Sequence, residues 1–427
     1  MEKFFYESMP EGMAKDEIKA AALEVIKGRI LGKVLILPPD LTRLHSGAGY
    51  ITNVLYHALA EQRCVVDIIP ALGTHVPMTT EELQTMFGDI PLDRFFEHNW
   101  RRDVVKLGEV PADFISKVTE GLWEEKVSAE VNRHIMDPGY DLILSIGQVV
   151  PHEVIGMANH AKNLFVGVGG SDMINKTHLI GAIFGMERVM GKDHSPVREI
   201  FDYALNNYLR DRPICFLLTV TTEERGCVKT HGMFIGDKRS VLEKAIELSQ
   251  KKNINFVERS LSNCVVYLDP EEFKSTWLGD KAIYRTRMAM ADGGQLLILA
   301  PGVTRFGEDP EVDMLIEKYG YCGRERILQH YSEQQELKDN MSVAAHLIHG
   351  STEGRFSIKY AVKKEYIERF KRAGIDAVDY EKAAEKYDPR QLQYGYNAID
   401  GEEVFFIPNP ALGLWGKRTD LKTKRLS

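Results

Sequence analysis

The chain is poor in several features that mark large classes of protein. Its 427 residues include five cysteines, an odd number, and no Cys-x-x-Cys pair. A disulfide framework and a cysteine zinc site are therefore both disfavoured, and a reducing cytoplasm suits the chain. No apolar run approaches the ~20 residues of a membrane-spanning helix. The N-terminus carries acidic residues and no long apolar core, so it does not predict a signal peptide.

Positive charge is also in deficit. The formal net charge is −8, with 44% hydrophobic and 27% charged residues. The negative balance argues against a general nucleic-acid binder, which needs a basic surface, but it leaves room for a local basic patch that binds an anionic small molecule. We therefore expect a cytoplasmic α/β enzyme or binding protein with a small-molecule partner, no nucleic acid and no membrane. If the chain assembles with a copy of itself, we expect a homodimer.

Short apolar runs alternate with helical patterns in the first half of the chain. Apolar spacing predicts a helix over residues 48–62, and Thr79-Thr80-Glu81-Glu82 predicts the start of another. Strands are expected at residues 33–37, 64–70 and 140–146, with a further one at 162–168. This alternation predicts a Rossmann-like, mainly parallel sheet with helices on both faces.

The second half reads as a separate unit. We expect strands at 265–268 and 295–300, and a helix over 284–291 that Asp292-Gly293-Gly294 ends. We assign residues 1–268 to an N-terminal cofactor-binding α/β domain and 269–427 to a smaller α/β C-terminal domain, with the active site in the cleft between them. Roughly the last 25 residues are expected to pack back on the N-terminal domain.

Polar residues follow three of the expected strands, at the carboxyl ends where parallel sheets bind ligands. Asp40, Thr42 and Arg43 follow the first strand, His75 follows the second and His152 follows the third. A hydroxyl and a guanidinium suit an anion, and imidazoles suit acid–base work. The competing interpretation is a capped turn with structural histidines, but histidines at successive strand ends favour chemistry.

The stretch 151–178 combines three histidines, Lys162 and a glycine-rich turn at 167–171. Its spacing matches no HExxH or two-cysteine zinc site, and the turn is neither G-x-G-x-x-G nor a Walker A loop. A metal held by one histidine and an organic ligand would leave such a sparse pattern. We interpret His160 as a helix-surface residue rather than a metal ligand. Further on, Tyr284-Arg285-Thr286-Arg287 offers two guanidinium groups, for which a solvated basic face is the competing interpretation.

Taken together, these motifs resemble the lactate racemase family, the nickel-pincer enzymes. The resemblance depends on PPDLTR (38–43), ALGTHVPMT (71–79), GQVVPHEVIGMANHAK (147–162) and His178. It covers the N-terminal two-thirds of the chain well and the remainder only loosely.

The resemblance implies a role for each matched position. Lys162 would be attached covalently to the nickel pincer, a pyridinium-3-thioamide-5-thiocarboxylate mononucleotide, and His178 would bind the nickel. His75 and His152 would be the alternating acid–base pair, and Arg43 would contact the substrate. The remaining matched positions would orient groups or bind the cofactor phosphate: Asp40, Thr42, Gly169, Gly170 and Ser171. Cofactor-biosynthesis proteins would be transient partners.

The implied reaction is inversion at C2 of a 2-hydroxy acid by proton-coupled hydride transfer, through a transient 2-oxo acid. The chain departs from the family at the usual Gly-Gly pair, where it has Ala158-Asn159-His160, and at the second-domain lysine, here Met288. We therefore expect a larger, polyhydroxylated acid, an aldonate such as gluconate, contacted by Tyr284, Arg285, Arg287 and His160. The alternatives are racemisation of lactate or another short-chain acid, a zinc-dependent hydrolase or lyase, and a non-catalytic binder of a phosphorylated metabolite.

Overall fold

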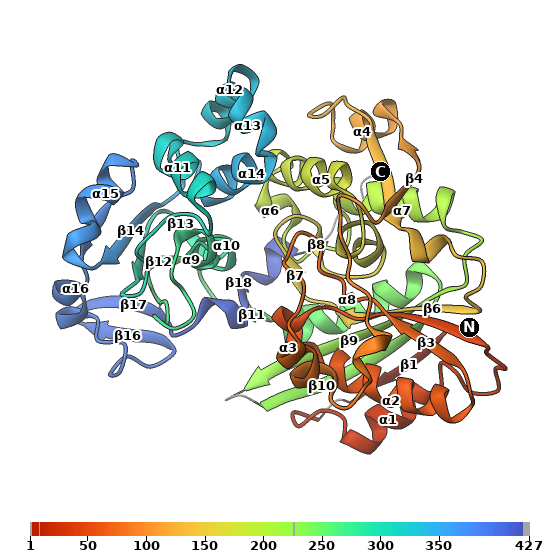
Figure 1. Ribbon diagram of the computed structural model, residues 1–427. Coiled ribbons are helices and arrows are strands. Elements are labelled where there is room, and N and C mark those ends of the chain that lie inside the picture. Colours follow the sequence, from red (N-terminus) through yellow and green to blue (C-terminus); the bar gives the residue numbers. More distant parts are fainter. Residues whose placement is uncertain (1, 8, 225–226, 422–427) are drawn as a thin grey trace. The chain divides into compact units, whose positions relative to one another are not determined.

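The structure, a computed structural model, describes residues 2–7, 9–224 and 227–421 (Figure 1). The chain forms two compact units, one from residues 1–180 and 190–253, the other from 181–189 and 254–427. The second unit takes in residues before the expected start at 269, because β12 (Leu261–Tyr267) pairs with β13 (Met290–Leu299) and β17 (Glu402–Ile407) in its sheet.

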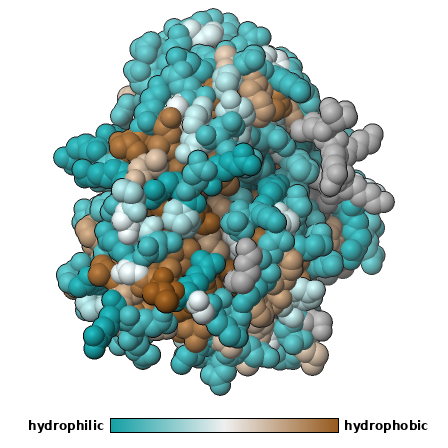
Figure 2. All heavy atoms as spheres, turned by 90° about the vertical axis from the view of Figure 1, so that its right-hand side faces the viewer, coloured by the Kyte–Doolittle hydropathy of each residue, from teal (hydrophilic) through white to brown (hydrophobic). Residues whose placement is uncertain are grey.

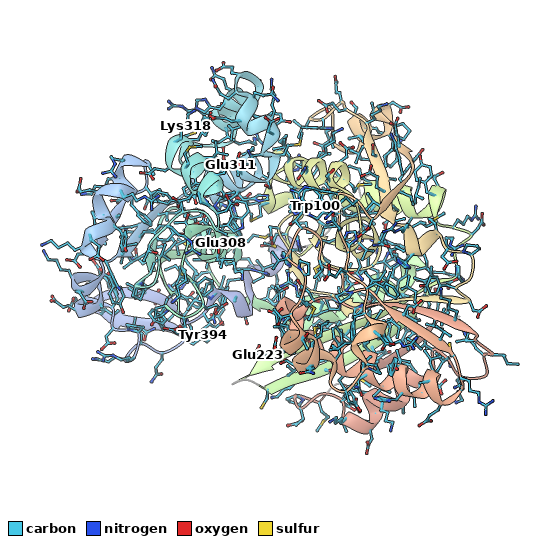
Figure 3. All side chains as sticks on the ribbon, viewed as in Figure 1. Trp100, Glu223, Glu308, Glu311, Lys318 and Tyr394 are labelled. Atoms are coloured by element: carbon cyan, nitrogen blue, oxygen red, sulfur yellow. The ribbon has the colours of Figure 1, made fainter. Side chains whose placement is uncertain are left out.

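The first unit is built on a six-stranded sheet. Four strands are mutually parallel, and two antiparallel strands extend one edge. The order is β1 (Lys3–Tyr6), β10 (Cys227–Gly236), β9 (Ile214–Glu224), β6 (Leu142–Gln148), β2 (Lys33–Leu37) and β3 (Val65–Ile68). The β9–β10 pair continues past the end of β6, as the position of Glu223 near the end of β9 shows (Figure 3). The expected mainly parallel sheet is confirmed.

Alternation of side chains along the strands assigns the two faces of this sheet. Leu142, Leu144 and Ile146 of β6 pack in a core with residues of α1 (Lys15–Leu23) and α2 (Ala48–Glu61). α2 agrees with the predicted helix, and the predicted start at Thr79 is confirmed, since Thr79 and Glu82 form a capping box at α3 (Thr80–Phe87). α8 (Arg239–Lys252) packs on β9 and β10.

The remaining elements of the first unit connect the sheet strands or cover them. Their bounds are β4 (Val104–Val110), α4 (Ala112–Val118), β5 (Val127–Asn132), β7 (Pro151–His152), β8 (Gly156–Met157) and α7 (Pro196–Tyr208), with α5 (Ser171–Phe184) running across the boundary at residue 180. After β3 the chain returns to form β6 on the other side of β2. The sheet order therefore reverses between β2 and β6, and the carboxyl ends at such a reversal are where α/β sheets bind ligands.

Residues 162–168 do not form the expected strand. Asn163–Gly167 is a single π-helical turn. The Asn163 side-chain amide donates to the Leu37 carbonyl at 3.1 Å and to Ser145 Oγ at 2.9 Å, so the turn is tied to the end of β2 and the middle of β6. An apolar run cannot by itself distinguish a buried strand from a buried helical turn. The prediction was wrong because this tertiary anchor is invisible in local sequence.

The second unit has its own six-stranded sheet, ordered β15 (Ala377–Asp379), β14 (Ser357–Val362), β13, β12, β17 and β16 (Gly395–Ile399). All neighbours are parallel except β16, which is antiparallel to β17. The predicted helix over 284–291 ends at Thr286, and Asp292-Gly293-Gly294 lies inside β13. There the register jumps from Leu261↔Met290 to Asn263↔Gln295, so the glycines form a bulge and not a helix stop.

Short helices complete the second unit: α6 (Met186–Val189), α9 (Thr276–Gly279), α10 (Lys281–Thr286), α11 (Pro310–Tyr319), α12 (Arg324–Glu333), α13 (Gln335–Asp339), α14 (Met341–Gly350), α15 (Ile367–Arg372) and α16 (Tyr380–Lys386). β11 (Ile254–Phe256) pairs in parallel with β18 (Leu414–Gly416), so the late part of the chain packs beside residues 254–256. Among the described residues, no helix is both long and apolar enough to cross a membrane. On the face drawn in Figure 2, hydrophilic residues surround separate groups of hydrophobic ones.

Candidate active site

The candidate residues of the first unit gather at the carboxyl ends of its parallel strands. The segments that follow β2 and β3 touch through a parallel bridge between Pro39 and Ala71. The Gly73 amide, two residues before His75, donates to the Gly167 carbonyl at 2.8 Å. This hydrogen bond ties the His75 loop to the π-helical turn that follows Lys162. Sequence-distant candidates are thus brought to one edge of the sheet, as predicted.

Asp40 holds the imidazole of His75. Nδ1 of His75 lies 2.6 Å from Oδ2 of Asp40, and the Thr42 hydroxyl donates to Oδ1 at 2.5 Å. The Asp40 side chain is buried, whereas that of His75 is 57% exposed. Burial alone would raise the pKa of Asp40, but the hydrogen bonds from His75 and Thr42 lower it below its ordinary value. Because the carboxylate can only accept, Nδ1 of His75 carries the proton and Nε2 keeps its lone pair.

His152 has a different hydrogen-bond partner. It ends β7 and is buried, and its Nδ1 accepts the Val154 backbone N–H at 3.1 Å. The neutral ring therefore carries its proton on Nε2. Glu153 Oε2 lies 3.9 Å from the same Nδ1. Each of the two candidate acid–base histidines thus has a carboxylate near Nδ1, at 2.6 Å for His75 and 3.9 Å for His152.

The pKa of His152 shows which charges share its neighbourhood. Burial holds this pKa well below the ordinary histidine value, and Glu153 opposes that shift. The positive charges of Lys162, His178 and Arg43 lower the pKa further. These three predicted site residues therefore contribute to the electrostatic surroundings of His152. His152 is neutral near neutral pH in the protein alone.

Lys162 immediately precedes the π-helical turn. Burial lowers the pKa of its amine to about 8, and the positive charge of Arg43 acts in the same direction. Glu153 and Asp40 oppose this, and Arg198 adds to it. An amine with a lowered pKa is deprotonated in a larger fraction of molecules at neutral pH and is a better nucleophile. This is the chemistry that covalent attachment of a cofactor needs.

His178, on α5, presents one ring nitrogen as a donor. Its Nδ1 donates to the Ile174 carbonyl one turn earlier, at 2.6 Å. Burial lowers the pKa of the ring. Nε2 therefore keeps its lone pair, and a backbone carbonyl on the opposite nitrogen is the usual support of a metal-binding histidine.

The side chains of this site cannot hold a metal on their own. Within residues 2–7, 9–224 and 227–421, no group of three or more His, Cys, Asp or Glu side chains is arranged to bind one ion. His75, His152 and His178 therefore do not form a zinc triad, which disfavours the zinc hydrolase alternative. An ion on His178 would need donors from a bound organic group, and the reactive amine of Lys162 could anchor such a group. The residues fit a pincer-type cofactor.

The glycine turn after Lys162 has packing reasons for its glycines. A side chain at Gly169 would place Cβ 1.9 Å from the Phe165 carbonyl oxygen, and one at Gly170 would place it 2.0 Å from Oε2 of Glu130. The pKa of Glu130 is raised by burial and then by the charge of Asp172. Two carboxylates beside the turn disfavour a bound phosphate. Binding of the cofactor phosphate by Gly169, Gly170 and Ser171 stays a prediction, and the two negative charges disfavour it.

His160 is not the helix-surface residue that we expected. Its side chain is 1% exposed and stacks on Phe216 of β9 with ring centroids 3.8 Å apart. Neither ring nitrogen has a hydrogen-bond partner, and burial keeps the pKa well below its ordinary value. Asn159 and His160 both have left-handed backbones, with φ of 72° and 60°. The interpretation failed because nothing in the local pattern reveals a buried left-handed turn.

The second-domain candidates are engaged inside the second unit. The Tyr284 hydroxyl lies 2.7 Å from Nδ1 of His346. Arg287 is buried, with Nε 2.8 Å from Oε1 of Glu187 and Nη1 donating to the His349 carbonyl at 2.8 Å. A solvated basic face is therefore wrong for Arg287, whose guanidinium has structural partners. Arg285 is half-buried. Substrate contacts by Tyr284, Arg285 and Arg287 stay predictions.

Two important residues were missed by the sequence analysis. Asn163 anchors the turn beside Lys162, and a signal existed, since an amide next to a reactive lysine inside an apolar run is unusual. Arg198, on α7, is wholly buried and donates to backbone carbonyls of Met157 and Asn159. It lies far from these residues in sequence, and no local pattern indicates it.

Comparison with known proteins identifies the α/β domain that carries these residues. Residues 16–191 match the model of the lactate racemase N-terminal domain. These residues therefore form a domain of the lactate racemase N-terminal type. No curated protein matches the chain.

Two solved structures share the fold. A Thermotoga maritima protein from a structural genomics consortium is similar with a TM-score of 0.77 and 24% identity, over 95% of this chain and 99% of that one. The lactate racemase apoprotein of Thermoanaerobacterium thermosaccharolyticum is similar with a TM-score of 0.68 and 15% identity, over 92% of this chain and 88% of that one.

Proposed function

We propose that the protein inverts C2 of a 2-hydroxy acid, with a nickel-pincer nucleotide attached to Lys162 and His178 as the protein ligand of nickel. The match of residues 16–191 to the lactate racemase N-terminal domain supports a 2-hydroxy-acid racemase in general terms. The observation that carries the finer proposal is the pair of carboxylate-flanked histidines, at 2.6 Å for His75 with Asp40 and 3.9 Å for His152 with Glu153. Inversion needs two acid–base groups, one for each configuration of the substrate at C2.

The two histidines have different resting states in this proposal. His75 keeps a lone pair on Nε2 and accepts the substrate hydroxyl proton, while Asp40 stabilises the imidazolium that forms. His152 becomes the acid when its Nδ1 is also protonated. The proton on Nδ1 displaces the Val154 N–H, and Glu153 at 3.9 Å supplies the counter-charge. Bound at Lys162, the cofactor supplies the hydride acceptor, and all proton movement belongs to these residues.

The substrate is proposed to be a larger or polyhydroxylated acid, an aldonate such as gluconate, rather than lactate. Met288, at the position of the family's carboxylate-binding lysine, is a buried apolar residue. Arg287 has an ion pair with Glu187. Arg285 and Arg287 are both proposed as substrate contacts, and substitution of each tests them. A different set of polar groups around the substrate favours a different acid.

Conversion of single enantiomers or C2 epimers tests this function. The protein is produced together with pincer-synthesis proteins, loaded with nickel, and incubated with lactate, short 2-hydroxy acids and aldonates in deuterium oxide. We expect inversion at C2 with little deuterium at that carbon, because the hydrogen travels as hydride. Extensive deuterium at C2 would show enolisation instead, and no inversion of any acid would overturn the proposal. Lactate as the best substrate would overturn only the aldonate assignment.

A further inference from the structure

The loop between His152 and Lys162 receives hydrogen bonds from one neighbouring segment. Residues 191–198, which we call the clasp, approach the loop 155–159 and donate hydrogen bonds to its backbone carbonyls. Ser195 Oγ donates to the Ile155 carbonyl at 2.9 Å, and the Gly191 amide donates to the Gly156 carbonyl at 2.9 Å. A loop whose carbonyls are satisfied from one neighbouring segment takes its shape from that segment.

Arg198 provides the last contacts of the clasp. Its Nη2 donates to the Met157 carbonyl at 2.7 Å, and Nη1 and Nη2 each lie 3.3 Å from the Asn159 carbonyl. The side chain is among the most completely buried in the protein. Burial lowers its pKa to about 10, so the guanidinium remains charged at neutral pH. A buried charge with two carbonyl acceptors is a costly element to keep unless the geometry it imposes is needed.

The geometry in question is the left-handed turn at Asn159 and His160. Both residues have φ between 60° and 72°, a region that side chains other than glycine rarely adopt. The carbonyl held by Arg198 belongs to Asn159 itself. Lys162 follows two residues later, and Asn163 is tied to β2 and β6. Arg198 therefore holds the first residue of the strained turn, and the lysine follows the second residue of that turn by two positions.

We infer that Arg198 is a positioning residue for Lys162, because it holds the left-handed Asn159–His160 turn that delivers the amine to the strand ends. The importance of Lys162 rests on the proposed function, but the positioning does not depend on a bound cofactor. The inference accounts for a wholly buried arginine outside the predicted site. It also accounts for the tolerance of two successive non-glycine residues in a left-handed turn.

The clasp is itself supported from α8. Arg239 donates from Nε to Asp202 of α7 at 3.0 Å and also pairs with Asp193 of the clasp. Asp202 lies one turn after Arg198 and acts on its pKa as an opposite charge. The groups whose charges act on Lys162 are Arg43, Glu153, Arg198 and Asp40. Arg198 is thus one of several charges around the amine, and the inference depends on its two carbonyl contacts.

The test measures the titration of Lys162 in the protein as isolated, without cofactor. Lys162 is labelled with an amine-reactive ester from pH 6 to 11 and quantified by peptide mass spectrometry. Arg198→Lys keeps a positive charge but cannot donate to both carbonyls in the same way. The half-labelling pH is the pH at which half of Lys162 is labelled. In Arg198→Lys we expect this pH to rise from about 8 towards the ordinary lysine value of about 10.4. Arg198→Met should give the same rise or a larger one.

Glycines at the strained positions provide the decisive comparison. Asn159→Gly with His160→Gly allows the left-handed turn without strain. In that double-glycine background, Arg198→Lys should therefore change the half-labelling pH of Lys162 by no more than about half a pH unit.

Arg210→Lys, which replaces an exposed arginine beyond α7, is the matched control and should leave the half-labelling pH of Lys162 unchanged. Unfolding in urea, followed for every variant, should show the same rescue by glycine. A half-labelling pH unchanged in Arg198→Lys, or no rescue by the glycines, would overturn the inference. Cofactor mass at Lys162 is measured separately, so failure of the proposed function would remain distinguishable.

Discussion

Nδ1 of His75 lies 2.6 Å from Oδ2 of Asp40, and the carboxylate is buried while much of the imidazole is exposed. The buried partner holds Nδ1 of the ring and does not engage Nε2. This relationship assigns His75 a tautomer, and with it the capacity to accept a proton. Under the proposed function, Asp40 would act as a positioning residue for His75.

Replacing Asp40 with Asn should damage turnover more than binding. The amide can donate to Nδ1 and so favour the wrong tautomer of His75, and it cannot stabilise an imidazolium. We expect kcat to fall by roughly 10²–10⁴-fold with a smaller change in KM, as for other carboxylate–histidine pairs. Steady-state kinetics with the best acid from the substrate screen measures this. Thr42→Val, which removes only one hydrogen bond to Asp40, should cost much less. Equal losses in the two variants would refute the orienting role.

Glu153 should control the protonation of His152. At rest, burial holds the pKa of His152 well below its ordinary value, and Glu153 is the charge that raises it. Glu153→Gln should therefore lower this pKa further. The imidazolium form would then be lost at a lower pH, so the pH profile of kcat should lose activity on its alkaline side at a lower pH than in the unmodified protein. A profile that does not move would exclude Glu153 from the proton transfer.

Lys162 should react as an unusually acidic lysine. Its pKa is lowered to about 8 by burial and then by Arg43, so neutral amine accumulates as pH rises through about 8. The exposed Lys244, on α8, is labelled in the same samples and serves as an internal control. Arg43→Gln should raise the half-labelling pH of Lys162, since a positive neighbour is removed. Parallel labelling curves for the two lysines would contradict the account.

Gly169 should be needed for packing. Gly169→Ala would place Cβ 1.9 Å from the Phe165 carbonyl oxygen, which is backbone and cannot move aside cheaply. We expect a loss of roughly 1–3 kcal/mol in the free energy of unfolding, measured in urea. Ser171→Ala, at the start of α5, should cost much less. If instead Gly169→Ala folds with full stability and fails only to acquire cofactor, the turn binds the cofactor phosphate after all.

The fold was predictable because its strands and helices are marked by local pattern. The runs 33–37 and 140–146, the helix over 48–62 and the cap at Thr79 all agree with β2, β6, α2 and α3. The segment 162–168 and the helix over 284–291 failed for one reason. In each, a contact distant in sequence decides the local conformation, namely the Asn163 amide across β2 and β6, and the bulged pairing of β13 with β12.

In the candidate site too, some features were predictable from local sequence and others depend on contacts distant in sequence. His75, His152, Lys162 and His178 were singled out by residue type and by their position after expected strands. Their partners were not, since the Val154 amide and the Ile174 carbonyl belong to the backbone. The burial of His160 and the reach of Arg198 depend on how α7 packs on the loop 155–159. Sequence pattern indicates which groups carry chemistry, and packing decides their tautomers and pKa values.

The most direct test of the account is the mass of the peptide that contains Lys162. The protein is produced with and without pincer-synthesis proteins, with nickel in the medium, alongside Lys162→Ala and His178→Ala. We predict an added cofactor mass on Lys162 only in their presence. The added mass should persist in His178→Ala while nickel content drops, and both should be lost in Lys162→Ala. An unmodified Lys162 in active protein would contradict the central claim.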